Sequence, residues 1–449
     1  MNVYLDRRML WVLAIGALSG FPWAIFSSLV TLRMQDAGIS KGEIGLFGLV
    51  ALAYTLNLLW APLIDAIRLP HPKSLAKLAG RRKSWILVFQ LLVLALALVL
   101  ASLPFSEEFL WWIALVCALM AFAGATQDVA IDALRIELIG PTEGNKAAAA
   151  AAMATTGWWL GYSGLGALLV LTTGRLETAG VSDPVQVALY LSAPLGFLIW
   201  WVVALWVPEP QQVAAMPRPS EQSTAAPKGV AAAFGVLYRQ MLSVYGQPVL
   251  LFLRQYGWRL AIGLLVLIFL FKSGEAFLGR MSLVFYRELG LDYQQIGWGK
   301  LASTITVVVS SILGGLITVR WGLVRGLLIG GVLMAGTNLL FSELAQRGPD
   351  TSFFLFAVVA DQVTSAIATV VFVAFISQLC NRAYAATQYA ALASLGNLSR
   401  TSLAAFSGYL VMELDDDWSV FFIITAVMVL PSLILLMSLS RRLERIFRR

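Results

Sequence analysis

Acidic side chains lie inside long apolar stretches of this chain, where a charge is costly. Asp128 and Asp132 fall in the stretch 109–138 and are four residues apart, so on a helix they share one face. An ionised residue at the centre of a bilayer costs roughly 2.5–3.5 kcal/mol on insertion scales. Because two carboxylates this close disfavour double ionisation, one of them is suited to carry a proton. We predict that Asp128 serves proton transport and that Asp132 is structural, paired with Arg135 or Arg81.

Two oppositely charged residues occur together in the stretch 260–286. Lys272 and Glu275 are three residues apart, which places them on adjacent turns of one helical face. In one interpretation they neutralise each other, so that the helix can enter the membrane. In the other, Lys272 binds an anionic group of a substrate and Glu275 exchanges protons. The spacing is compatible with both interpretations.

A third acidic site lies in the second half of the chain. Asp361 and Gln362 fall in the stretch 352–380, and their placement mirrors that of Gln127 and Asp128 in the first half. We predict that Asp361 takes part in proton transport and that the two glutamines bind substrate.

Basic residues also occur at membrane depth. Arg400, in the stretch 386–412, is predicted to bind a substrate carboxylate or to pair with an acid. Lys300 and Arg280 lie toward the outer ends of their stretches, so we expect their long side chains to reach the membrane surface. The one histidine, His71, lies in a polar stretch, so proton coupling must use carboxylates rather than imidazole.

The sequence offers little material for enzyme chemistry. It contains no Ser-His-Asp set, no H-E-x-x-H metal motif and no phosphate-binding loop. Its two cysteines, Cys117 and Cys380, lie in opposite halves within apolar runs and imply neither a disulfide framework nor a metal cluster. We therefore expect no enzymatic activity, no metal and no cofactor.

The composition indicates which kind of protein must position these groups. Of the 449 residues, 59% are hydrophobic and 13% are charged, whereas soluble proteins average about 45–50% apolar and roughly 25% charged. This excludes a soluble enzyme, a secreted disulfide-rich protein and a disordered chain. A membrane helix needs about 20 mostly apolar residues, and twelve stretches qualify. They are 9–33, 41–64, 83–103, 109–138, 145–173, 187–207, 260–286, 296–319, 323–344, 352–380, 386–412 and 418–440.

The twelve stretches form two sets of six around the polar segment 208–258. We predict an all-α membrane protein with two six-helix bundles, residues 1–207 and 259–449, joined by this segment as a cytoplasmic linker. The prolines of 208–227 predict a flexible tether. Helical spacing of apolar residues in 234–256 favours an interfacial amphipathic helix over a plain loop. Transporters with two such halves bind substrate between them and alternate access by rocking.

The placement of Lys and Arg predicts the orientation in the membrane, because these residues concentrate on the cytoplasmic side. With the N-terminus inside, the predicted cytoplasmic segments hold about 23 of the 32 basic residues. We therefore predict that both termini are cytoplasmic. The net charge of +7 reflects these patches between apolar stretches, so we expect no nucleic-acid partner.

The loop after the second stretch contains Asp65 and then Gly80-Arg81-Arg82-Lys83, which resembles the Asp…Gly-Arg-Arg loop of the major facilitator superfamily. A carboxylate at a helix end that faces a guanidinium can close one side of a transporter by charge-assisted hydrogen bonds. The resemblance predicts a cytoplasmic gate of Asp65, Arg81 and Arg82, with Asp132 beside it. In the alternative interpretation, the basic residues only anchor the loop in the cytoplasm.

Four motifs resemble the AmpG permease family, which imports muropeptides across the bacterial inner membrane during cell-wall recycling. The resemblance implies the twelve-helix major facilitator fold, a monomer, and a central cavity lined by the first, fourth, seventh and tenth spans. Asp128, Glu275 and Asp361 are then expected to face one shared aqueous space. The motifs are Gly16-Ala-Leu-Ser-Gly-Phe-Pro22, Leu59-Trp-Ala-Pro-Leu-Ile-Asp65, Thr126-Gln-Asp-Val-Ala-Ile-Asp-Ala133 and Leu379-Cys-Asn-Arg-Ala-Tyr-Ala-Ala-Thr-Gln-Tyr389.

Aromatic residues within the spans are candidates for binding a sugar. Trp159 and Tyr162 lie in the stretch 145–173, and Tyr54 lies in the stretch 41–64. Their rings are suited to stack on sugar rings. In the alternative interpretation they contact lipid or the membrane interface, as aromatic residues of membrane helices commonly do.

Together these features predict a proton-coupled symporter of the bacterial inner membrane that works by alternating access. Its expected partners are the lipid bilayer, protons and a small solute, namely anhydromuramyl peptides with or without a GlcNAc residue. The AmpG-like family shades into importers of siderophores and acetyl-CoA. Import of a siderophore–metal chelate or a CoA ester by the same fold is therefore the alternative function.

Overall fold

The computed structural model describes residues 6–61, 64, 69, 80–139, 144–209, 250–380 and 385–447. Within these residues, all regular secondary structure is helical. Asp65 and residues 210–249 of the predicted linker 208–258 lie outside the described residues. The end of that linker, residues 250–256, is helical and buries Phe252.

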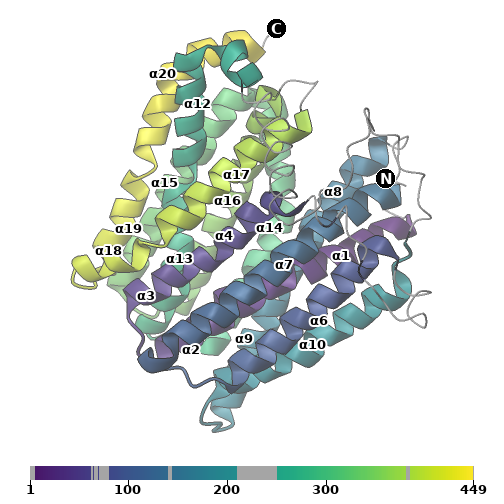
Figure 1. Ribbon diagram of the computed structural model, residues 1–449. Coiled ribbons are helices and arrows are strands. Elements are labelled where there is room, and N and C mark those ends of the chain that lie inside the picture. The colour runs from purple at the N-terminus through teal and green to yellow at the C-terminus, as the bar shows by residue number, and fades with distance from the viewer. Residues whose placement is uncertain are drawn as a thin grey trace.

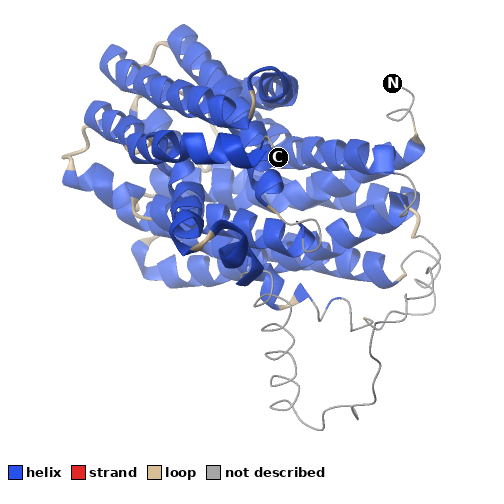
Figure 2. Cartoon of the chain, turned by 90° about the horizontal axis from the view of Figure 1, so that it is seen from above, coloured by secondary structure: helices blue, strands red, loops and turns tan. Residues whose placement is uncertain are grey.

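Each of the twelve predicted membrane stretches coincides with one helix or with consecutive helices, and Figure 2 shows helices throughout the fold. Among the described residues, eight helical segments are long and apolar enough to cross a membrane. We call residues 7–206 the N-half and residues 258–447 the C-half. The N-half comprises α1 (Arg7–Ala24), η2 (Ile25–Leu29), α2 (Val30–Asp36), α3 (Lys41–Leu46), η3 (Phe47–Ala51), α4 (Leu52–Leu56), η4 (Asn57–Leu59), α6 (Arg81–Ser102), η5 (Glu107–Phe109), α7 (Leu110–Ile139), α8 (Gly144–Trp159), η6 (Leu160–Gly164), α9 (Leu165–Thr178) and α10 (Pro184–Trp206). The C-half comprises α12 (Trp258–Phe271), α13 (Ser273–Glu288), α14 (Tyr293–Trp321), α15 (Leu323–Arg347), α16 (Thr351–Leu379), α17 (Ala385–Ala404), α18 (Ser407–Glu413), α19 (Trp418–Val427) and α20 (Leu430–Phe447).

Both chain termini lie at the same end of the molecule, which we call the terminus end (Figure 1). The opposite end is called the far end. At the far end, helices of the two halves lie against each other, α3 against α18, α9 against α14 and α2 against α13. Toward the terminus end, the ribbons of the two halves diverge (Figure 1).

The buried apolar residues follow the same asymmetry. At the far end, one hydrophobic cluster combines both halves and includes Phe21 of the N-half with Phe285 and Phe422 of the C-half. Toward the terminus end, the core is divided into one cluster around Leu134 of the N-half and another around Phe375 of the C-half. The described apolar cores are therefore joined at one end of the molecule and separate at the other.

Glycines allow the first and fifth membrane helices to pack closely. Gly16 and Gly20 on α1 pack against the helix that contains Gly157 and Gly161. Gly157 lies on α8 and Gly161 on η6, the segment that follows it. A Cβ atom at Gly16 would lie only 2.6 Å from the carbonyl oxygen of Ala154, and a Cβ at the other three would also press on the facing backbone. This spacing of small residues is a common way to bring membrane helices together.

We predict that Gly157→Ala lowers stability by about 1–3 kcal/mol, because the new methyl group forces α1 and α8 apart. The thermal midpoint of the purified protein in detergent measures this effect. Gly279→Ala is the matched control, since a Cβ at Gly279 meets no atom within 4 Å. Equal midpoints for the two variants would contradict the close packing of α1 on α8.

Candidate functional site

Several membrane helices lose regular α geometry near their middle. The π-helical segments η2 and η6 interrupt the first and fifth helices, and α12 gives way to α13 at Lys272, where φ is −102° and ψ is 7°. π-Helical bulges and interrupted membrane helices recur at functional sites. The two π-helical segments adjoin, because the Ser27 hydroxyl donates to the Tyr162 hydroxyl at 3.3 Å. These interruptions indicate a site at mid-membrane depth.

On the N-half side, aromatic rings gather around η6. Tyr162 lies 5.2 Å from Trp158 and 5.8 Å from Trp159 between ring centroids. Trp23 of α1 lies 4.9 Å from Tyr54 of α4 and 6.4 Å from Tyr162. Tyr54, Trp159 and Tyr162, predicted separately from the sequence, therefore belong to one aromatic cluster rather than contacting lipid independently. Trp23, which completes this cluster, was missed by the sequence analysis.

On the C-half side, Lys272 and Glu275 are in contact. The Lys272 ammonium lies 2.5 Å from a Glu275 carboxylate oxygen and donates to the Thr369 hydroxyl of α16 at 2.6 Å. Lys272 is only 7% exposed, so its charge depends on this partner. Glu275 lies in the first turn of α13, where an acidic side chain interacts favourably with the helix dipole. The contact expected from the spacing is present.

Asp361 lies on α16 in the C-half and is buried. It is 5% exposed and accepts a hydrogen bond from the Thr337 hydroxyl of α15 at 3.3 Å. Its charge interacts with those of Lys272 and Glu275. Gln362, the next residue, is partly exposed.

The fourth membrane helix holds a separate acidic site. Asp128 accepts a hydrogen bond from the Ser19 hydroxyl of α1. Asp132 is exposed and pairs with Arg135 at 2.9 Å, as expected for a structural role. Gln127 is completely buried, and neither polar atom of its amide has a hydrogen-bond partner among the described residues. Its role in binding substrate stays a prediction.

The three acids are divided between the halves. Glu275 and Asp361 lie in the C-half, whereas Asp128 accepts its hydrogen bond from α1 within the N-half. Helix α7 packs against α1, and α16 packs against α15. That the three acids face one shared space stays a prediction.

Two basic residues reach across to the N-half. A guanidinium nitrogen of Arg280 donates to the carbonyl of Ile44 on α3, and the Lys300 ammonium lies 5.1 Å from the centre of the Tyr162 ring. The expectation that both extend to the membrane surface is wrong, because α13 and α14 pack against the N-half. Arg400 on α17 is exposed, and its charge also acts on Tyr162.

At the terminus end, the basic loop residues bind partners that the sequence analysis missed. Arg81 and Arg82 approach a Glu137 carboxylate oxygen at 3.6 and 3.0 Å. The backbone N–H of Arg82 donates to Glu209 at 2.6 Å. These contacts tie α6 to α7 and to the end of α10 within the N-half. The predicted gate residue Asp65 lies outside the described residues.

At the far end, ion pairs connect the two halves. The Lys41 ammonium lies 2.9 Å from Glu288 and 2.6 Å from Asp416. Arg287 lies 3.5 Å from Asp36, which also accepts a hydrogen bond from a tyrosine hydroxyl of α14. The sequence analysis missed this network, because its members come from helix ends and one loop that are far apart along the chain.

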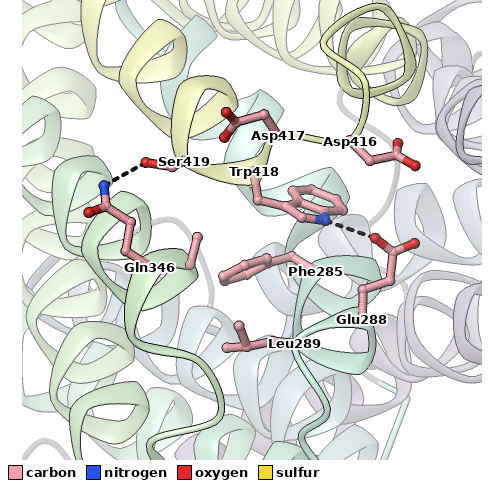
Figure 3. Close-up of a pocket in the computed structure, with 9 residues that line it drawn as sticks. Phe285, Glu288, Leu289, Gln346, Asp416, Asp417, Trp418 and Ser419 are labelled. Atoms are coloured by element: carbon pink, nitrogen blue, oxygen red, sulfur yellow. Dashed lines mark hydrogen bonds between the residues drawn. The ribbon is translucent and has the colours of Figure 1, made fainter.

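A pocket of about 580 Å³ adjoins this network (Figure 3). Trp418 donates its indole N–H to Glu288 at 2.8 Å, and Gln346 donates to Ser419 at 2.9 Å (Figure 3). The pocket lies among the ends of α13, α15 and α19. It therefore belongs to the far-end contacts and not to the mid-membrane site.

Side chains that could bind a metal ion were sought among the described residues. Among them, no group of three or more His, Cys, Asp or Glu side chains is placed to hold a metal ion. Cys117 and Cys380 are both free thiols in this part of the chain.

Comparison with known proteins identifies relatives along the whole chain. The family model of the Major Facilitator Superfamily matches residues 12–286 and 275–447. The anhydromuropeptide permease of Escherichia coli is 29% identical over 450 residues, which cover 99% of this chain and 82% of that protein. The AmpG 4 transporter of Rickettsia conorii is 27% identical over 444 residues, which cover 99% of each. The resemblance to AmpG permeases drawn from the motifs is thereby confirmed.

Solved structures share the fold. The nucleoside transporter NupG matches with a TM-score of 0.64 and 15% identity, covering 100% of both chains. The peptide transporter POT, in complex with sulfate, matches with a TM-score of 0.65 and 14% identity, covering 98% of this chain and 95% of that one. At these identities the likeness concerns the fold alone, and it confirms the predicted twelve-helix architecture.

We predict that Lys272→Met destabilises the protein by about 3–5 kcal/mol, because Glu275 is left as an unpaired buried charge. The double variant Lys272→Met, Glu275→Leu should recover most of that loss, since both charges are gone. Thermal midpoints of the parent, single and double variants in detergent form the test. A double variant that is as unstable as the single variant would contradict the conclusion that Lys272 and Glu275 compensate each other's charge.

Proposed function

This chain belongs to the major facilitator superfamily, and we propose that it is a transporter that imports muropeptides across the bacterial inner membrane together with protons. Muropeptides combine sugar rings with a short acidic peptide. Relatives named AmpG and anhydromuropeptide permease support this solute class. The observation that carries the proposal is the arrangement at mid-membrane depth, where the N-half supplies an aromatic cluster and the C-half supplies buried charges.

The two sides of the site suit the two parts of such a solute. The rings of Trp159, Tyr162 and Tyr54 offer flat apolar faces on which sugar rings stack. Lys272 and Arg400 supply cations for the carboxylates of the peptide, with Gln362 nearby as a hydrogen-bonding partner. Aromatic surfaces with a few placed polar groups are typical of small-molecule sites.

Proton coupling follows from the need for charge balance in an apolar environment. Lys272 is neutralised by Glu275 when the site is empty. When a carboxylate of the solute takes the Lys272 ammonium, Glu275 loses its counter-charge and binds a proton from water to remain neutral. Asp361 shares the same electrostatic environment and serves as a second proton carrier. Asp128 is assigned the corresponding role in the N-half.

The observed conformation suits release of the solute to the cytoplasm. The positive-inside distribution of Lys and Arg places the terminus end in the cytoplasm. The far end, where the apolar cores merge and Lys41 bridges the halves, then faces outward and is closed. Residues 1–207 and 259–449 act as the two rocking units, joined by the linker 208–258.

We predict that Asp361→Asn reduces uphill accumulation of labelled anhydromuropeptide in right-side-out vesicles, because Glu275 is left as the remaining proton carrier in the C-half. Exchange of solute between equal concentrations on the two sides should be preserved. The amide keeps the hydrogen bond from Thr337 but cannot release or bind the proton. Uptake driven by an imposed pH gradient is the measurement, with a protonophore as reference.

Glu343→Gln is the control for this experiment, because Glu343 is an exposed acid that pairs with Arg347 on the same helix. It should accumulate solute like the parent. Parent-level accumulation by Asp361→Asn, or accumulation insensitive to the protonophore, would contradict the coupling.

We predict that Lys41→Gln shifts the population toward the form open at the far end, because one ammonium holds both Glu288 and Asp416. A membrane-impermeant maleimide should then label Val284→Cys several-fold faster, since Val284 is 1% exposed in the closed form. Labelling in whole cells reports on the outer side.

Arg347→Gln is the matched control, since it removes an exposed far-end cation whose partner lies on the same helix. Labelling should stay at the parent rate in this variant. Equal rates in Lys41→Gln and Arg347→Gln would show that the Lys41 bridge does not hold the halves together.

A further inference from the structure

Three basic side chains lie between the two halves without a carboxylate partner in the described part of the chain. Arg280, Lys300 and Arg400 form no ion pair with any described residue, whereas Lys272 is balanced by Glu275. Cations at membrane depth are costly and persist where they face water, pair or bind something. The space between the halves therefore carries an excess of positive charge.

Arg280 crosses from α13 into the N-half and keeps a donor free. One of its guanidinium nitrogens donates to the Ile44 carbonyl. Its Nε is buried and finds no hydrogen-bond partner among the described residues. This nitrogen lies 3.2 Å from the position that a Cβ on Gly48 would take. A buried donor without a partner costs free energy. The Arg280 side chain thus holds a hydrogen-bond donor that a bound solute could use.

Lys300 crosses from α14 in the same direction. Its Cε lies 3.4 Å from the position of a Cβ on Gly166, and its ammonium lies over the Tyr162 ring at 5.1 Å. A ring face attracts a cation but does not neutralise it. The donors of the ammonium are not used by any carboxylate among the described residues.

Arg400 supplies the third charge from α17. Its side chain is exposed, and its charge acts on Tyr162, Lys272 and Glu275. Arg280 and Lys300 act on the same tyrosine. Lys300 thus lies over the Tyr162 ring, and the charges of Arg280 and Arg400 act on the same tyrosine of the aromatic cluster.

We propose that Arg280, Lys300 and Arg400 form an anion-binding site that selects solutes carrying two or more carboxylates. The inference rests on the proposed function, and it assigns the specificity for the peptide part to these side chains. Guanidinium groups bind carboxylates through paired charge-assisted hydrogen bonds, and clustered charge between low-dielectric walls concentrates anions. A neutral sugar derivative leaves the three cations unbalanced and binds weakly.

The test compares charged and neutral forms of the same probe on the full-length protein in detergent. The probes are an anhydromuramyl tripeptide, its form with amidated carboxylates, a glutamyl tripeptide and a glutaminyl tripeptide. Affinities come from calorimetric titration. The parent should bind each acidic probe roughly ten-fold or more tightly than its neutral counterpart.

Variants assign the selectivity to residues. Arg400→Gln and Lys300→Gln should each weaken binding of the acidic form more than binding of the amidated form, and so reduce the preference for the acidic form. Arg325→Gln removes an exposed arginine of α15 and should keep the full preference, which controls for net charge. Arg280→Lys keeps the charge but changes the contact with Ile44, and it should retain part of the preference.

Equal affinity of the parent for acidic and amidated probes overturns the inference, as does the absence of binding by every probe. Equal weakening of both forms in Arg400→Gln and Lys300→Gln also overturns it, because the residues would then act only on structure. If glutamyl tripeptide binds selectively but the anhydromuropeptide neither binds nor is taken up, the anion site stands and the proposed function fails. If the anhydromuropeptide is taken up regardless of amidation, the proposed function stands and the anion site fails.

Discussion

Electrostatic neutrality within an apolar medium is the constraint on which this structure depends. The C-half meets it by placing Lys272 against Glu275 and by bonding the ammonium to Thr369 at a break between two helices. The N-half holds Asp128 against the Ser19 hydroxyl. Because the charges of Lys272 and Glu275 cancel, a charged solute that enters there must be accompanied by a compensating proton. Transport and protonation are thus linked by charge rather than by a dedicated relay.

The halves are held together unequally along the membrane normal. At the far end they share one apolar cluster, and Lys41 bridges two acids of the C-half, while the cores are separate toward the terminus end. Lys41 is 12% exposed, but its partners Glu288 and Asp416 are 33% and 55% exposed, so water screens these ion pairs. Ion pairs that water screens contribute little each, typically about 0–1 kcal/mol. The ion pairs at the far end are therefore weak enough to break during a transport cycle. The apolar residues buried there would need new apolar contacts at the terminus end when the far end opens.

The fold was predictable because uninterrupted apolar stretches longer than a bilayer is thick leave few alternatives, and each coincides with helix in the structure. The Lys272–Glu275 contact was predictable because it is local to one helix. Arg280 and Lys300 were misplaced because their neighbours, Ile44 and Tyr162, belong to other helices, and sequence spacing carries no information on which helices pack together.

The most direct test of the account measures protons and solute in the same vesicles. Proteoliposomes that contain the purified protein and an internal pH-sensitive dye start with equal pH on both sides, and anhydromuropeptide is added outside. The account predicts that the lumen acidifies as the solute enters, in a fixed ratio to the amount taken up. Entry of the solute at an unchanged luminal pH would contradict it.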